Sequence, residues 1–235
     1  MKTDNFNIPT RLAQKFRLEN GLSMSEAVNV KSLIRKLNIL TVYRPMSDYA
    51  YGLSLKSPKG HRFILVNSNS SRGRQHFTIA HELYHLYYDE NPHPHICGKD
   101  GTSRTERNAD RFASALLMPE EGIIGMLTDE EYAEKKISIA KILRLEQYFG
   151  VSRSTMLIRL KELNLISVTL FESLKSYSAI NTAKEYGYDK SLYQSGNENL
   201  VIGDYGEKAR VLFEDEKISE GHYLELLNLI QDEQG

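Results

Sequence analysis

Hydrophobic residues occupy nearly every side of one stretch, residues 74–89, and no Pro or Gly interrupts it. A helix that is apolar almost all round is typical of a protein core. Two stripes appear at helical spacing, one made of Phe77, Ala80, His81, Tyr84, His85 and Tyr88, the other of Ile79, Leu83, Leu86 and Tyr87. The pattern therefore predicts a buried helix that begins near the N-cap candidates Ser70 and Ser71.

Shorter patterns before this stretch predict two further helices and three strands. Helices are expected over residues 8–20 and 25–37. Runs that are rich in β-formers or that alternate predict strands at residues 39–43, 49–56 and 62–67. The sequence Ser57-Pro58-Lys59-Gly60 is typical of a hairpin turn. We therefore expect an α+β fold, in which a small antiparallel sheet packs on the buried helix.

The stretch 103–119 predicts a second helix that directs acidic side chains toward its apolar face. Its inward stripe consists of Ala109, Phe112, Ala113, Leu116 and Leu117. Glu106 extends that stripe, and Asp110 lies at its edge. Carboxylates on a core-facing stripe are costly unless a cation or a hydrogen-bond donor meets them.

The buried helix also carries the motif His81-Glu82-x-x-His85, which places two imidazoles one turn apart. Two histidines and the carboxylate of Glu106 would form a His2Glu zinc site. Glu82 is then a candidate base for the attacking water. Asp110 is expected to accept the second N–H of one ligand histidine, which fixes its tautomer.

Simpler interpretations of these residues stay open. His81 and His85 could hydrogen-bond to the backbone, and Ser103-x-x-Glu106 is also a capping box. Further potential metal ligands in the loop 89–101 are His93, His95 and Cys97. That loop contains prolines and lacks a clear fourth ligand, so an exposed loop is favoured over a second metal site.

The two motifs together resemble a known family. Gln75-His-Phe-Thr-Ile-Ala-His-Glu-Leu-Tyr-His-Leu, followed by Glu106-x-x-Ala-Asp-x-Phe-Ala-x-x-Leu-Leu-Met-Pro119, resembles the ImmA/IrrE metallopeptidases. The Glu-x-x-x-Asp after His-Glu-x-x-His is also similar to the thermolysin-like gluzincins. The resemblance implies a zincin-type helix, with His81, His85 and Glu106 as metal ligands and Glu82 as general base. Zn²⁺ is the expected ion, with Mn²⁺ or another divalent metal as alternatives.

The same resemblance implies a function. It indicates a zinc-dependent endopeptidase that cleaves a specific regulatory protein, such as a helix-turn-helix repressor, and that binds the substrate backbone along one sheet edge. One departure is Tyr84, where the family often has Gly. For the donor that stabilises the oxyanion, Tyr84 and His76 are the candidates. The alternative is a non-catalytic regulator or toxin–antitoxin component that binds protein or DNA.

Residues 137–166 predict a helix-turn-helix, with Gly150 at the turn and Ser152 as cap of the second helix. The basic residues of that second helix are Arg153, Arg159 and Lys161. They leave DNA binding open, but Glu162 lies among them and the net charge of the chain is only −1. A unit that packs on the peptidase or contacts a protein is therefore favoured, and we expect Arg153 and Arg159 to take part in that contact.

The patterns divide the chain into a zincin-like domain (1–136), the helix-turn-helix segment (137–166) and a mainly helical region (167–235). In the last region, helices are expected near 183–188, 205–213 and 219–230, and a strand at 200–202. Apolar residues make up 40% and charged residues 26%, as in ordinary soluble domains. With Cys97 as the single cysteine and no apolar run of membrane-spanning length, a cytoplasmic protein is expected.

Overall fold

The computed structural model describes residues 8–89, the backbone of 97–98, and residues 103–231, of which only the backbone is described from 229 on. His93 and His95 lie outside the described residues. One sheet has the strand order β4-β2-β3-β1-β5. Its strands are β1 (Leu40–Arg44), β2 (Ala50–Lys56), β3 (Arg62–Asn67), β4 (Cys97–Gly98) and β5 (Val201–Ile202).

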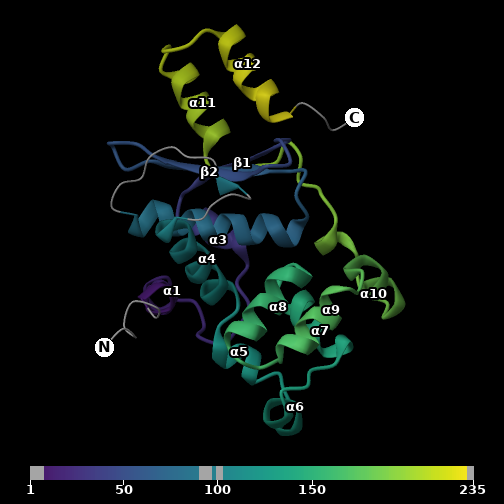
Figure 1. Ribbon diagram of the computed structural model, residues 1–235. Coiled ribbons are helices and arrows are strands. Elements are labelled where there is room, and N and C mark those ends of the chain that lie inside the picture. The colour runs from purple at the N-terminus through teal and green to yellow at the C-terminus, as the bar shows by residue number, and fades with distance from the viewer. Residues whose placement is uncertain (1–7, 90–96, 99–102, 232–235) are drawn as a thin grey trace.

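Helices make up most of the remaining described chain (Figure 1). Before residue 125 they are α1 (Ile8–Glu19), α2 (Val30–Lys36), α3 (Arg72–Tyr88), α4 (Arg104–Leu117) and α5 (Glu120–Ile124). The later ones are α6 (Asp129–Glu134), α7 (Ile139–Phe149), α8 (Arg153–Glu162), α9 (Val168–Lys175), α10 (Ala179–Glu185), the 3-10 helix η2 (Ser191–Tyr193), α11 (Tyr205–Glu214) and α12 (Glu220–Gln231). The prediction of an α+β fold is therefore confirmed.

The expected antiparallel sheet is right for one pair of strands and wrong for another. β2 and β3 form the predicted antiparallel hairpin, in which Gly60 adopts a positive φ of 86° at the turn. β1, however, pairs with β3 in parallel, so the sheet is mixed. A five-residue run of β-formers carries no directional signal, and the hairpin places β3 rather than β2 beside β1.

α3 lies along one face of the sheet, and α4 packs against α3 on the side away from it (Figure 1). α3 is buried along most of its length, as its apolar pattern predicts. α4 begins at Ser103, whose hydroxyl accepts a hydrogen bond from the backbone N–H of Glu106 at 3.1 Å. Arg17 of α1 is buried and donates to the carbonyl of Leu116, which fastens the end of α4 to the N-terminal segment.

The helix-turn-helix forms as predicted from α7 and α8. Gly150 ends α7 with a φ of 65°, a conformation that favours glycine. Ser152 then caps α8 by accepting from the N–H of Thr155 at 3.3 Å. His76 of α3 contacts the carbonyl of Gly150 through its Nδ1 at 2.8 Å, so the turn is held against the buried helix.

The expectation that Arg153 and Arg159 contact a partner protein is wrong. Both side chains are buried, with 6% of each residue exposed. Arg153 forms an ion pair with Glu146 of α7, which is fully buried, and Arg159 donates to the carbonyl of Met118 at 3.1 Å. Their guanidinium groups are bonded inside the chain and are therefore not available for the surface contact that their charge suggests.

The C-terminal region contributes to the sheet as well as adding helices. The expected strand at 200–202 is β5, which pairs antiparallel with β1. Gln75 of α3 is fully buried and donates to the carbonyl of Gly196, while Asn197 donates back to its side-chain oxygen at 2.7 Å. One cluster of buried residues runs from Ala13 to Ile202. This core includes residues from all three predicted parts of the chain. The three-part division therefore stays a prediction.

α11 and α12 form a hairpin on the other side of the sheet from α3 (Figure 1). Phe213 and Tyr223 stack between them, with ring centroids 5.0 Å apart and planes inclined by 8°. Among the described residues, no helix combines the length and the apolar character needed to cross a bilayer.

The buried pair yields a first prediction. Replacing Arg153 by Ala leaves the carboxylate of Glu146 buried without its cation, so we expect a loss of about 3–5 kcal/mol in the free energy of unfolding. Urea denaturation followed by circular dichroism measures this loss. Arg144→Ala, at an exposed position of α7, is the control and should change stability by less than about 0.5 kcal/mol. Equal effects of the two substitutions would contradict a structural role for Arg153.

Candidate metal centre

α3 brings His81 and His85 to one side of the helix, one turn apart, facing α4. The two rings lie 5.0 Å apart between centroids, and both residues are buried. Glu106, from the first turn of α4, meets them from the opposite side. The structure thus brings together the three residues that the sequence predicts as metal ligands.

The outer ring nitrogens of both histidines are occupied by carboxylates. Nδ1 of His81 lies 2.9 Å from Oδ1 of Asp110, and Nδ1 of His85 lies 3.1 Å from Oδ2 of Asp89. A carboxylate accepts, so each Nδ1 carries the proton and each Nε2 presents a lone pair. Burial, and then the neighbouring His81, lower the pKa of His85, which favours this neutral form.

The inner nitrogens converge on Glu106. The two Nε2 atoms lie 3.2 Å apart, and the Glu106 carboxylate oxygens lie 3.2 Å from Nε2 of His81 and 3.4 Å from Nε2 of His85. In a tetrahedral zinc site with bonds of about 2.05 Å, neighbouring ligand atoms stand roughly 3.3 Å apart. Three acceptors at this spacing repel one another unless a cation lies among them. The donor set and its geometry therefore fit one divalent ion.

Glu82 provides a second sign of the same chemistry. Glu82 is fully buried, and both of its carboxylate oxygens lack a hydrogen-bond partner among the residues that the structure describes. A buried carboxylate in this situation is costly unless a nearby positive charge stabilises it. Glu82 also contributes to the electrostatic field at His85. The arrangement places a buried carboxylate beside the candidate ligand cluster.

Gly52 of β2 allows the sheet to approach α3 at this point. A Cβ atom there would lie 2.6 Å from Cγ2 of Thr78 and 2.7 Å from the carbonyl oxygen of Leu65, both too close. It would also lie 3.7 Å from Oε1 of Glu82. Glycine at this position thus sets the distance between β2 and the face of α3 that carries Glu82.

The remaining candidates take other positions. His76 binds the carbonyl of Gly150 through Nδ1 and joins α3 to the α7–α8 turn. Tyr84 is buried, and its ring packs edge-on against His85, with centroids 5.8 Å apart and planes inclined by 83°. Only the first half of the alternative capping box is seen: Ser103 caps the backbone N–H of Glu106, whereas the Glu106 carboxylate lies against the two histidines.

Two residues of the site were missed in the sequence. Asp89 stands one turn after His85 and could have been found by the same i, i+4 spacing that relates Glu106 to Asp110. Gly52 could have been found as an isolated glycine within a strand pattern, which indicates a close approach of another backbone or side chain.

Comparison with known proteins places the chain in a family. A search of curated proteins found no match. The family model described as the IrrE N-terminal-like domain, a peptidase domain, matches residues 34–161. The match covers more than half of the chain and includes β1, β2, β3, α3 and α4, hence all the residues of the cluster. The chain belongs to the IrrE N-terminal-like domain family and is a metallopeptidase-type protein.

Proposed function

We propose that the protein is a zinc-dependent endopeptidase, with His81, His85 and Glu106 as metal ligands and Glu82 as general base. The observation that carries this proposal is the convergence of three acceptor groups beside a buried carboxylate without a hydrogen-bond partner in the described part of the chain. A donor set of two imidazoles and one carboxylate is typical of zinc peptidases.

The chain's own residues have distinct roles in peptide hydrolysis. A divalent cation, when bound, supplies Lewis acidity that polarises the scissile carbonyl and lowers the pKa of water. Glu82 takes the proton of the attacking water on a carboxylate oxygen and later delivers it to the leaving amine. Asp110 and Asp89 hold the two imidazoles in the tautomer that presents Nε2 inward.

A protein substrate follows from the peptidase domain, and we propose that it is a helix-turn-helix repressor. This narrower substrate rests on the resemblance to the ImmA/IrrE metallopeptidases in the two metal-site motifs. The backbone of the substrate would add to the sheet at the outer edge of β2, the strand whose Gly52 faces Glu82. Among the described residues, β4 pairs with that edge at Ala50 and Gly52, so strand addition would extend from Leu53 onward.

The ligand assignment predicts the metal content of purified variants. His85→Ala and Glu106→Ala each remove one of three protein ligands, so we expect bound zinc to fall from about one ion per chain to a small fraction of that. Elemental analysis after gel filtration measures it. His222→Ala, an exposed histidine on α12, is the control and should keep the full content. Full zinc content in both ligand variants would refute the assignment.

The outer carboxylates predict a graded effect on affinity. Asp110→Asn and Asp89→Asn each weaken the orientation of one imidazole, so we expect zinc affinity to fall by about 10- to 100-fold. Competition with a chromophoric chelator measures the change. Asp129→Asn, in the exposed first turn of α6, is the matched control. Unchanged affinity in Asp89→Asn alone would show that only His81 depends on its carboxylate.

Glu82→Gln separates binding from catalysis. The amide keeps the shape of the side chain but cannot take a proton, so zinc content should be retained while cleavage falls by about 10²–10⁴-fold. Cleavage of a small helix-turn-helix repressor encoded beside the gene, followed by gel electrophoresis, gives one measurement. A pool of internally quenched peptides gives a second measurement that is independent of that choice of substrate. Cleavage by Glu82→Gln at the parental rate would remove Glu82 from the mechanism.

A further inference from the structure

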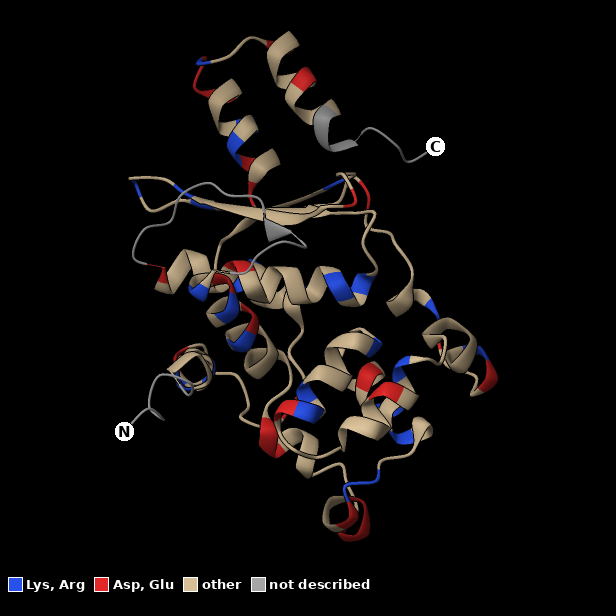
Figure 2. Cartoon of the chain, in the orientation of Figure 1, with Lys and Arg blue, Asp and Glu red and all other residues tan. Residues whose placement is uncertain are grey.

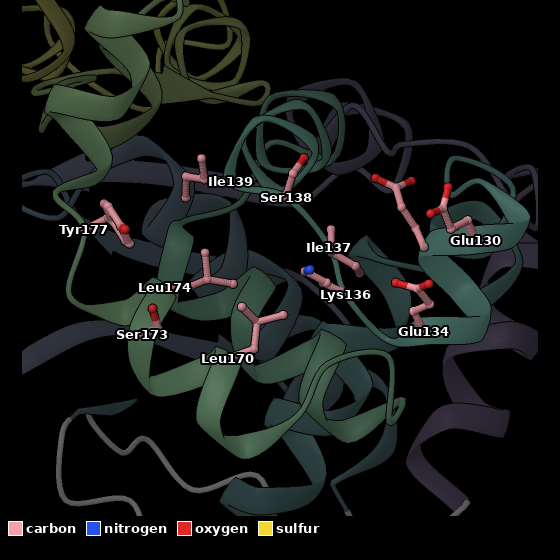
Figure 3. A pocket seen from close by; sticks show the side chains of 11 residues that line it. Glu130, Glu134, Lys136, Ile137, Ser138, Ile139, Leu170, Ser173, Leu174 and Tyr177 are labelled. Carbon is pink, nitrogen blue, oxygen red and sulfur yellow. The ribbon is translucent and has the colours of Figure 1, made fainter.

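A cavity of about 500 Å³ opens between α6 and α9, and we call it the α6–α9 groove (Figure 3). Glu130 and Glu134 of α6 form one wall. Leu170, Leu174 and Tyr177 form the other, and Ile137 lies between the two walls. Its volume lies within the range of roughly 300–1,000 Å³ that is usual for binding sites.

The acidic wall belongs to a short helix that has little packing of its own against the core. α6 contains no buried residue, so the hydrophobic core does not fix its place. Thr128 and Glu131 instead close a capping box at its start. Lys141 of α7 binds Glu131 at 3.2 Å and the carbonyl of Met126 at 2.7 Å, which ties the helix to the body.

This arrangement leaves the charge of α6 directed outward. The Lys141 partner neutralises Glu131, whereas Glu130 and Glu134 are exposed and line the groove. The first turn also includes Asp129. Figure 2 shows acidic residues on this short helix, at the end of the molecule away from the sheet, with basic residues in the segment that follows it. Lys136 also lines the groove and offsets one of these charges, so a segment that binds here meets a net negative charge on this side.

The opposite wall is apolar. Leu174 and Ile137 are buried, Leu170 is partly buried, and Tyr177 remains 54% exposed at the rim. When a partner covers exposed apolar surface at a cavity rim, the removal of that surface from water stabilises the complex. The groove thus combines an apolar surface with an acidic one, on elements that do not contribute to the metal centre.

We propose that the α6–α9 groove binds a basic, amphipathic segment of a partner protein. Apolar side chains of that segment enter between Leu170, Leu174 and Tyr177, and its Lys or Arg residues meet Glu130 and Glu134. Charge complementarity selects this occupant, because the same glutamates repel the phosphates of nucleic acids and of anionic membranes. The groove is an interaction surface distinct from the metal centre.

A library of random peptides displayed on phage and selected on the full-length protein tests this proposal. We expect the enriched peptides to combine Lys or Arg with Leu, Ile, Phe or Met. One synthesised member, labelled with a fluorophore, then gives a Kd by anisotropy for the parent and its variants. Neither measurement depends on catalysis, so failure here and failure of the proposed peptidase function are distinguishable.

Two pairs of variants locate the binding. Ser173→Trp places a bulky ring in the groove from an exposed position. Thr169→Trp, its control, adds the same ring at an exposed position of α9 that does not line the cavity. Glu130→Lys with Glu134→Lys reverses the acidic wall, and Glu207→Lys with Glu225→Lys reverses two exposed glutamates on α11 and α12. We expect the Kd to rise about tenfold or more in the two groove variants, equivalent to about 1.4 kcal/mol, and to stay within about twofold in the controls.

Several outcomes would overturn the proposal. Enriched peptides that are neutral or acidic would remove the charge argument. Equal binding by Ser173→Trp and Thr169→Trp, with unchanged thermal unfolding, would place the peptide elsewhere. A parent protein that dimerises in gel filtration and becomes monomeric only in Ser173→Trp would make a second copy of the chain the occupant.

Discussion

Three hydrogen-bond acceptors face one another inside the core, and this is the constraint on which the rest of the structure depends. Nε2 of His81, Nε2 of His85 and the carboxylate of Glu106 lie within 4.8 Å of one another. In a low-dielectric interior such groups are destabilising unless a cation is shared among them. A divalent ion bound among them would stabilise the packing of α3 on α4, and the helices must be held firmly enough to keep the three groups together.

The surrounding fold meets that requirement from several sides. Gly52 lets the sheet approach α3 closely, and Gln75 fastens the start of α3 to residues 196–197 of the C-terminal region. Arg17 binds the end of α4 to the N-terminal segment. Ligands on helices with such buried polar anchors keep their geometry better than ligands on loops. The C-terminal region is therefore part of the support of the metal centre, although it lies outside the matched domain.

The sequence predicts those features that follow from spacing along a single helix. His81, His85, Glu106 and Asp110 repeat at one-turn intervals on apolar stripes, and the structure brings them together as expected. The parallel pairing of β1 with β3 was not predictable, because strand direction depends on which strand becomes the neighbour. The burial of Arg153 was not predictable either, since it depends on Glu146 in another helix. Charge is visible in a sequence, but the partner of a charge is a property of the fold.

The burial of charged side chains in α8 bears directly on the role of the helix-turn-helix. A recognition helix for DNA must present its side chains to a groove, yet six of the ten residues of α8 are buried, among them Arg153 and Arg159. The positive charges of this helix are largely used inside the protein, while the nearby α6 directs its negative charges outward. By the proposal above, the α6–α9 groove rather than α8 is the recognition surface of this part of the chain, and the helix-turn-helix contributes mainly to packing within the protein.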